Sequence, residues 1–250
     1  MNFPFLLTDS QYQILEPIFD PNPRRRKVDI KVVLSGIIYL LRTGCQWRYL
    51  PDCYGNWQNA YAYFRSWNDR AMLDSALYNL VSAVRKEAGK AAEPSAVVVD
   101  TQSIKAASGV SKAVGYDANK KIKGRKKSLA TDTLGNAVAV GIGPASCHDK
   151  KCVRTLQQQL EDLCRLDKIY GDGAFKGTPS FELSRRVQWE VVEKKGGPFK
   201  VLPKRWVVER TFAWLMNFRR LVRDYEKLEL VSRALIILAC IFITLKKLTT

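Results

Sequence analysis

The hydrophobic pattern of this chain changes at Glu93 and Pro94, and this change constrains the fold more than any other feature. Before it, apolar residues recur every three or four positions, which is the period of an amphipathic helix. After it come short β-branched runs bounded by turn-forming residues, which are typical of buried strands. We therefore expect an all-helical leader domain over residues 1–92 and an α/β domain with a mixed sheet over residues 93–250.

The leader contains four segments with a helical pattern. The first begins at Thr8 or Asp9, either of which can act as a helix N-cap. The second covers residues 30–41 and should stop at Gly44, because glycine readily adopts the left-handed conformation of a helix end. The third and fourth cover residues 56–67 and 71–90. Trp57 and the other aromatic residues of the third segment recur at helical spacing, and we expect them to pack in the core.

The α/β domain begins with a run of valines, residues 97–99, that reads as a buried strand and ends in Asp100. The other expected elements are a hairpin with strands at 128–131 and 137–142, an amphipathic helix at 153–166, strands at 166–170 and 189–192, and a long helix at 205–225. Strands that come first and are followed by helices alternating with strands predict a mixed sheet.

The chain is strongly basic. It has 41 Lys and Arg residues against 24 Asp and Glu residues, which gives a formal net charge of +17. A surplus of this size attracts polyanions, and nucleic acid is the first candidate. The alternative is a basic protein that binds nucleic acid only loosely. We favour a true nucleic-acid partner because the positive charges are clustered along the chain.

Three clusters are candidate contacts to DNA phosphates. The first lies in a turn before the second helix, and short helices joined by basic turns suit a helix-turn-helix-like module. The second is a stretch over residues 119–127 that contains no acid, for which a solvated loop is the alternative. The third follows Glu209 by about three helical turns. These clusters contain Arg24, Arg25, Arg26, Lys120, Lys121, Lys123, Arg125, Lys126, Lys127, Arg219, Arg220 and Arg223.

Three acidic residues are candidate metal ligands and catalytic residues. Asp100 and Asp172 follow expected buried strands, and ligands collect at the carboxyl ends of strands in open α/β sheets. Glu209 is expected on the inward face of the long helix, together with Trp206 and Phe212. Three carboxylates make an all-oxygen site suited to Mg²⁺ or Mn²⁺, and two such ions can promote cleavage of a phosphodiester.

Each acid also has an ordinary structural interpretation. Asp100 could cap a turn, Asp172 could lie in a Gly-Asp-Gly turn, and Glu209 could pair with a neighbouring arginine. Each interpretation taken singly is about as plausible as the metal role. The three acids together, in a chain this basic, favour the metal site.

Other site types fit the sequence poorly. Cys147, His148 and Cys152 lack the second cysteine pair of a typical zinc site, and no nucleophile motif accompanies the histidine. We expect His148 and Asp149 to shape the turn into the next helix. The apolar run at 234–245 is too short to span a membrane and predicts a buried helix. Without a signal peptide and with six irregularly spaced cysteines, the chain is expected to be cytoplasmic and nucleoid-associated.

Several motifs together resemble a known family over nearly the whole chain. The most specific motif is Arg205-Trp206-Val207-Val208-Glu209-Arg210-Thr211-Phe212-Ala213-Trp214-Leu215. The others are residues 42–51, 54–57, 64–67, 98–103, 130–135, 148–149 and 170–177. In these motifs the sequence is similar to the IS5-family insertion-sequence transposases, which are DDE transposases.

The resemblance implies an RNase H-like catalytic domain, a divalent cation and the cutting and transfer of the element's own DNA ends. Asp100, Asp172 and Glu209 would then form the catalytic triad, and Arg205 would contact a phosphate. A homodimer is expected because two DNA ends must be held. Wider relatives carry Tyr-x2-Arg-x3-Glu-x6-Lys around the glutamate, whereas this chain has Leu202 and Met216 at the Tyr and Lys positions. The DNA contacts of that Tyr and Lys therefore do not carry over, although Arg219 could replace the lysine.

Two other functions remain open at this point. One is a catalytically inactive, transposase-derived DNA-binding protein, and the other is a simple nuclease that cuts without joining. Retention of all three acids favours the active transposase.

Overall fold

The computed structural model describes residues 5–21, 28–176, 183–184, 187–192 and 206–249. The leader forms the four expected helices: α1 (Asp9–Phe19), α2 (Ile30–Thr43), α3 (Trp57–Asp69) and α4 (Met72–Glu87). Thr8 caps α1 and forms a reciprocal capping box with Gln11, as the polar start of the segment predicts. Gly44 ends α2 with a φ of 77°, which confirms the expected helix stop. Two 3₁₀ turns, η1 (Trp47–Tyr49) and η2 (Asp52–Tyr54), connect α2 to α3.

The second half contains a mixed sheet, as expected. Its strands are β1 (Ala96–Lys105), β2 (Gly115–Asp117), β3 (Ile122–Thr131), β4 (Ala137–Pro144), β5 (Lys168–Gly171) and β6 (Gln188–Val191). The strand order is β2-β3-β1-β5-β6, and β4 also pairs with β3. The β1–β3 and β3–β4 pairs are antiparallel, whereas β1–β5 and β5–β6 are parallel.

Helices cover both faces of the sheet. One face, here called the long-helix face, packs against α4, α7 (Trp206–Met216) and α8 (Glu229–Lys247). The other, the short-helix face, packs against α5 (Asp149–Cys152), the 3₁₀ turn η3 (Val153–Leu156) and α6 (Gln157–Glu161). Side chains alternate between the faces along β1, so that Val98 joins the cluster of the long-helix face while Val97 and Val99 join that of the short-helix face.

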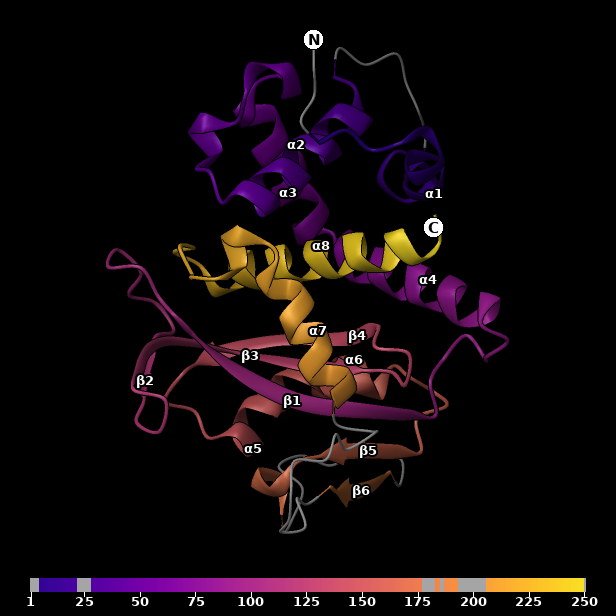
Figure 1. The fold of residues 1–250 in the computed structure, drawn as a ribbon, viewed down its shortest axis with the longest axis vertical. Coiled ribbons are helices and arrows are strands. Elements are labelled where there is room, and N and C mark those ends of the chain that lie inside the picture. The colour runs from indigo at the N-terminus through magenta and orange to yellow at the C-terminus, as the bar shows by residue number, and fades with distance from the viewer. Residues whose placement is uncertain (1–4, 22–27, 177–182, 185–186, 193–205, 250) are drawn as a thin grey trace.

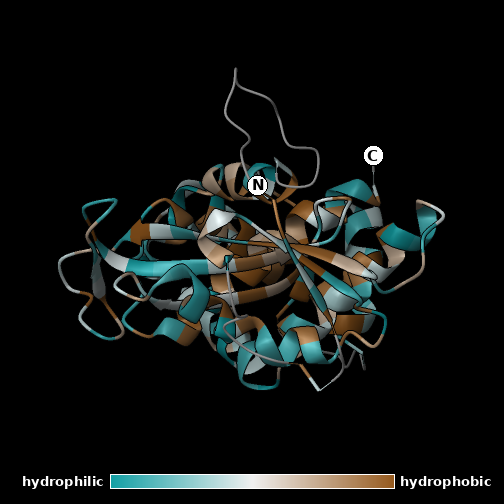
Figure 2. Ribbon diagram, turned by 90° about the horizontal axis from the view of Figure 1, so that it is seen from below, coloured by the Kyte–Doolittle hydropathy of each residue, from teal (hydrophilic) through white to brown (hydrophobic). Residues whose placement is uncertain are grey.

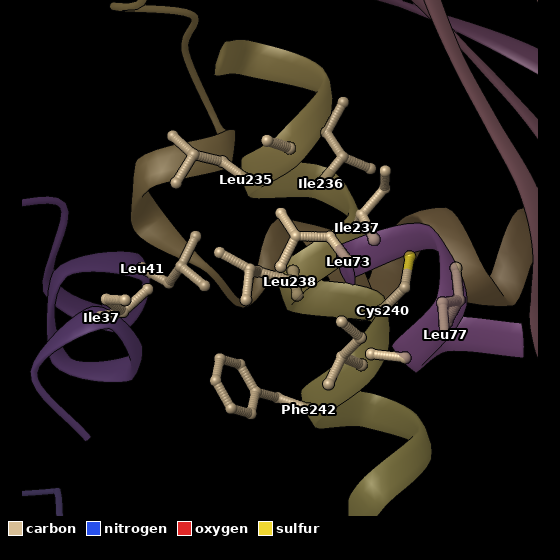
Figure 3. Close-up of a cluster of buried hydrophobic side chains, with 14 of the residues drawn as sticks. Ile37, Leu41, Leu73, Leu77, Leu235, Ile236, Ile237, Leu238, Cys240 and Phe242 are labelled. Carbon is tan, nitrogen blue, oxygen red and sulfur yellow. The ribbon is translucent and has the colours of Figure 1, made fainter. Parts of the chain in front are cut away.

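Helix α8 confirms the buried helix that the apolar run predicts. It lies between the leader helices and the sheet (Figure 1), and every residue from 234 to 242 is at most 4% exposed. Ile37 and Leu41 of α2 lie beside it on one side, and Leu73 and Leu77 of α4 approach it from another direction (Figure 3). No helix in the described part of the chain is long and apolar enough to cross a membrane.

One hydrophobic cluster runs through both halves of the chain. It joins residues of α1 to α4 with residues of the sheet, α7 and α8. In Figure 2 the brown, hydrophobic segments gather toward the middle of the molecule, with most teal segments at its margins. The connection between α4 and β1 contains the expected boundary at residues 92 and 93, but the hydrophobic core does not stop there. A division into two domains stays a prediction.

Some expected elements differ in the structure. In place of the amphipathic helix expected at 153–166, the structure has two short pieces, η3 and α6, directly after α5. The long helix at 205–225 is wrong beyond Met216, where α7 ends and the 3₁₀ turn η5 (Arg219–Leu221) follows. The strand expected at 128–131 begins earlier, at Ile122, so the basic stretch at 119–127 is mostly strand and not the solvated loop of the alternative interpretation.

Candidate active site

Asp100 lies on β1 and Asp172 directly follows β5, the parallel neighbour of β1, at a matching position. Strands β1 and β5 pair with Val98 opposite Tyr170, and each aspartate follows its residue of that pair by two positions. Asp172 comes directly after the end of β5. Asp100 does not lie at a strand end as expected, because β1 continues to Lys105. Alternation along β1 places Asp100 on the same face as Val98, the long-helix face.

Both aspartates are half-buried and each accepts a hydrogen bond from a nearby backbone amide. Asp100 Oδ1 accepts from Thr101 N at 2.7 Å. Asp172 Oδ1 accepts from Ala174 N at 2.9 Å and thereby caps the 3₁₀ turn η4 (Gly173–Phe175). Asp172 therefore stabilises a turn, as its ordinary structural interpretation predicts. These bonds restrain the two carboxylates without excluding a cation, because a carboxylate has about four acceptor positions.

Glu209 lies in the first turn of α7 and is exposed, which contradicts the expected inward position. The buried side of α7 is formed by Val207, Val208, Thr211, Phe212 and Leu215. Glu209 lies on the other side with Trp206, which is 38% exposed. The expectation was wrong because it placed Phe212 on the same face as Trp206.

The position of α7 over the sheet is fixed by contacts to the β3–β4 turn. Arg210 Nη2 donates to the Leu134 carbonyl at 3.1 Å, and Thr211 Oγ1 donates to the Gly135 carbonyl at 3.1 Å. Helix α7 packs against β1 and β3 and runs from the sheet toward α8 (Figure 1). Glu209 is thus carried by a helix that covers the sheet face of Asp100.

The structure brings the three expected metal ligands, Asp100, Asp172 and Glu209, together only in part. Among the residues that the structure describes, no three His, Cys, Asp or Glu side chains gather closely enough to hold a metal ion. Asp100 on β1 and Asp172 just after β5 come from neighbouring segments, whereas Glu209 is not gathered with them. The donor chemistry nevertheless fits Mg²⁺ or Mn²⁺, since all three are hard carboxylate ligands.

The basic stretch at 119–127 divides into an exposed part and a buried part. Lys120, Lys121 and Lys123 are exposed around the turn between β2 and β3. Arg125, Lys126 and Lys127 are buried in β3, so the prediction that they contact DNA conflicts with their positions. A buried cation needs a partner, and each of these three has one within the protein.

The partners of the buried cations come from distant parts of the chain. Arg125 Nη1 pairs with Asp224 Oδ2 at 2.8 Å, and Lys126 Nζ pairs with Asp149 Oδ1 at 2.7 Å. Lys127 Nζ donates to the Leu221 carbonyl at 2.8 Å. Burial lowers the pKa of Lys127 to about 8.

The remaining basic candidates have different outcomes. Arg24, Arg25, Arg26 and Arg205 lie outside the described residues. Arg219 is exposed, whereas Arg220 is buried and pairs with Glu226 at 2.6 Å, so a contact between Arg220 and DNA also conflicts with its position. Arg220 also donates to the Cys45 carbonyl at 3.0 Å and so joins η5 to the leader.

His148 and Asp149 shape the entry into α5, as expected. His148 is the N-cap of α5, and its Nδ1 accepts from Lys150 N at 3.3 Å. The sequence did not reveal that Asp149 also receives a hydrogen bond from Thr101, the residue after Asp100. The adjacent placement of a histidine and an aspartate in one motif was the only signal for this contact.

Comparisons with known proteins give two family matches and one similar relative. Residues 91–243 match the family described as "Transposase DDE domain", and residues 7–77 match the family described as "Putative transposase of IS4/5 family". The chain is also similar to the "Insertion element IS402 uncharacterized 16.2 kDa protein" of Burkholderia cepacia, with 30% identity over 111 residues. That alignment covers 40% of this chain and 74% of the relative. No solved structure matches the chain. The DDE match confirms the RNase H-like fold expected for the mixed-sheet half.

Proposed function

The chain belongs to the DDE transposases of the IS4/5 type, and from that premise we propose that it cuts its insertion element's DNA ends and joins them to target DNA. In the first step, a water oxygen attacks a phosphodiester, the bond from phosphorus to the 3′ oxygen breaks, and that oxygen takes up a proton. In the second step, the resulting 3′-hydroxyl loses its proton as it attacks a target phosphodiester, the bond from phosphorus to the target 3′ oxygen breaks, and that oxygen takes up a proton. Neither step needs an oxidant or a covalent enzyme intermediate.

Asp100, Asp172 and Glu209 are the residues that would hold the divalent cations. When bound, Mg²⁺ or Mn²⁺ would supply positive charge to the attacking and leaving oxygens. The pairing of β1 with β5 supports this assignment best. Val98 and Tyr170 lie opposite each other in these strands, and Asp100 and Asp172 each follow two residues later. Glu209 would complete the set from α7, which packs over β1.

Double-stranded DNA would be held by exposed cations. Lys120 and Lys121 are exposed in the turn between β2 and β3, Lys123 is exposed at the start of β3, and Arg219 is exposed beyond α7. Contacts of these side chains with phosphates would be independent of DNA sequence and weakened by salt. Two copies of the chain would act together, because the two ends of the element must both be held and joined to target DNA.

Substitution of the three acids tests the assignment. We expect Asp100→Asn, Asp172→Asn and Glu209→Gln each to abolish cutting and joining of labelled element ends in Mg²⁺, while DNA binding in a gel-shift assay is retained. Asp167→Asn is the matched control, because Asp167 is an exposed aspartate just before the opposite end of β5. Joining that persists in any of the three variants would remove that residue from the triad.

The same assay on the unmodified protein separates the other functions. DNA that is bound but never cut would identify an inactive, transposase-derived DNA-binding protein. DNA that is cut without being joined would identify a nuclease.

A further inference from the structure

A chain of hydrogen bonds approaches Asp100 from the opposite face of the sheet. Thr101 follows Asp100 in β1, so its side chain points to the short-helix face. Its hydroxyl donates to Asp149 Oδ1 at 2.7 Å, while its backbone N–H donates to Asp100 Oδ1 at 2.7 Å. Thr101 therefore connects the Asp100 carboxylate to the first residue of α5.

Asp149 is itself held firmly. Lys126 Nζ, on β3, donates to Asp149 Oδ1 at 2.7 Å and to the Cys147 carbonyl at 2.8 Å. Lys126 is only 5% exposed. Burial acts to raise the pKa of Asp149, but the hydrogen bonds from Lys126 and Thr101 outweigh it and lower that pKa, so the carboxylate stays ionised at neutral pH. Strand β3 therefore fixes the beginning of α5.

The next residue of α5 reaches the segment that carries Asp172. Lys150 Nζ donates to the carbonyl of Lys176, the residue at the end of the 3₁₀ turn that Asp172 caps. Helix α5 also packs against both β1 and η4. One short helix thus contacts both aspartate-bearing segments.

We propose that α5 is a clamp that sets the spacing between Asp100 and Asp172. Asp149 holds the β1 side through Thr101, and Lys150 holds the β5 side through the Lys176 carbonyl. These are positioning residues, which act through the aspartates and need no contact with DNA or cation. The inference rests on the proposed function, because the spacing matters only if both aspartates bind the same cations.

Thr101→Val tests the β1 side of the clamp. Valine keeps the shape of threonine but cannot donate to Asp149. We expect the dissociation constant for Mn²⁺, measured on the full chain without DNA by water-proton relaxation, to rise about 10-fold, as for other residues that orient metal ligands. Thr101→Ser keeps the hydroxyl and should bind Mn²⁺ like the unmodified protein. A role in stability alone would lower the melting temperature of Thr101→Val but leave Mn²⁺ affinity unchanged, and that result would overturn the clamp.

Lys150→Met tests the β5 side, with Lys151→Met as its matched control. Both substitutions remove one ammonium group from α5, but only Lys150 contacts the Lys176 carbonyl. Weaker Mn²⁺ binding in Lys150→Met alone would support the clamp. Equal Mn²⁺ binding in the two variants would contradict it.

Asp100→Asn distinguishes failure of the clamp from failure of the proposed function. Loss of Mn²⁺ binding in Asp100→Asn together with unchanged binding in Thr101→Val and Lys150→Met would leave the metal site standing and reject the clamp. Unchanged binding in Asp100→Asn would reject both, because Asp100 would then not be a ligand.

Discussion

The six basic residues at 119–127 are close neighbours in the sequence but lie in different surroundings in the structure. Lys120, Lys121 and Lys123 face solvent. Arg125 and Lys127 lie on the long-helix face of β3, where segments after α7 supply their partners. Lys126 points to the other face, toward Asp149. Exposure, which depends on the strand and its cover, decides which of these cations can reach DNA.

Replacing Arg125 should destabilise the protein strongly. Arg125→Met leaves Asp224 buried without its guanidinium partner, and breaking such a pair costs about 3–5 kcal/mol. Urea unfolding would measure this loss. The control, Lys123→Met, removes an exposed cation from the same strand and should change the free energy of unfolding by less than about 0.5 kcal/mol. A small effect in Arg125→Met would show that the ion pair contributes little.

Lys127 should make stability depend on pH in the alkaline range. Its pKa is about 8 in the folded protein, below the ordinary 10.5, because burial disfavours the charged form. Between these values the unfolded chain holds more protons, so the free energy of unfolding should rise with pH, by about 3 kcal/mol in all. Below pH 8 Lys127 is charged in the folded protein, so the folded state bears the full free-energy cost of burying that charge.

Comparison with Lys127→Met isolates this contribution. Methionine carries no proton, so the difference in free energy of unfolding between the unmodified protein and the variant should change from pH 8 to pH 10. A difference that stays constant over this range would contradict the lowered pKa.

At the level of elements, local signals in the sequence predict most helices and strands. The apolar period of α2 and its stop at Gly44 depend on neighbours in the chain, and both were predicted. The extent of β3 was not predicted, because Arg125 is buried in it and its ion-pair partner, Asp224, lies 99 residues away in the sequence. In the candidate site, both aspartates come directly after recognisable apolar runs of the sequence, whereas the orientation of Glu209 depends on which side of α7 the sheet covers. The hydrogen bond between Thr101 and Asp149 could not be predicted, because it depends on how α5 packs against the sheet.

The β3–β4 turn should control the position of α7. Gly135 has a φ of 81°, and a Cβ there would lie 2.6 Å from Arg210 Nη2. Gly135→Ala should therefore lose about 1 kcal/mol from its left-handed backbone, and Arg210 Nη2 should move away from its hydrogen bond to the Leu134 carbonyl. Because Arg210 neighbours Glu209, DNA cleavage should also decrease.

Gly89→Ala is the matched control for this substitution. Gly89 has a φ of 66°, but a Cβ there would meet nothing within 4 Å. Gly89→Ala should therefore lose only the free energy of unfolding that the left-handed backbone costs, and its DNA cutting should be unchanged. Urea unfolding and DNA cutting would be measured in parallel on both variants. Equal losses of stability and activity in both variants would show that the Arg210 contact does not position α7.

At the scale of the whole molecule, the shared core predicts that both halves unfold together. Residues of α2, α4, α8 and the sheet belong to one cluster. Leu238→Ala, at a fully buried position of α8, should lower the free energy of unfolding by about 2–5 kcal/mol. Circular dichroism and tryptophan fluorescence should report the same shifted midpoint. Two separate transitions would indicate independent domains.

Helix α8 also sets the order of events during synthesis. Every other described helix and strand leaves the ribosome before α8, yet α2, α4 and β4 all pack against it. Until α8 emerges, the apolar surfaces that it covers stay open to water or to chaperones. A nascent chain with both aspartates already translated therefore still lacks the helix that joins its two halves in one hydrophobic core.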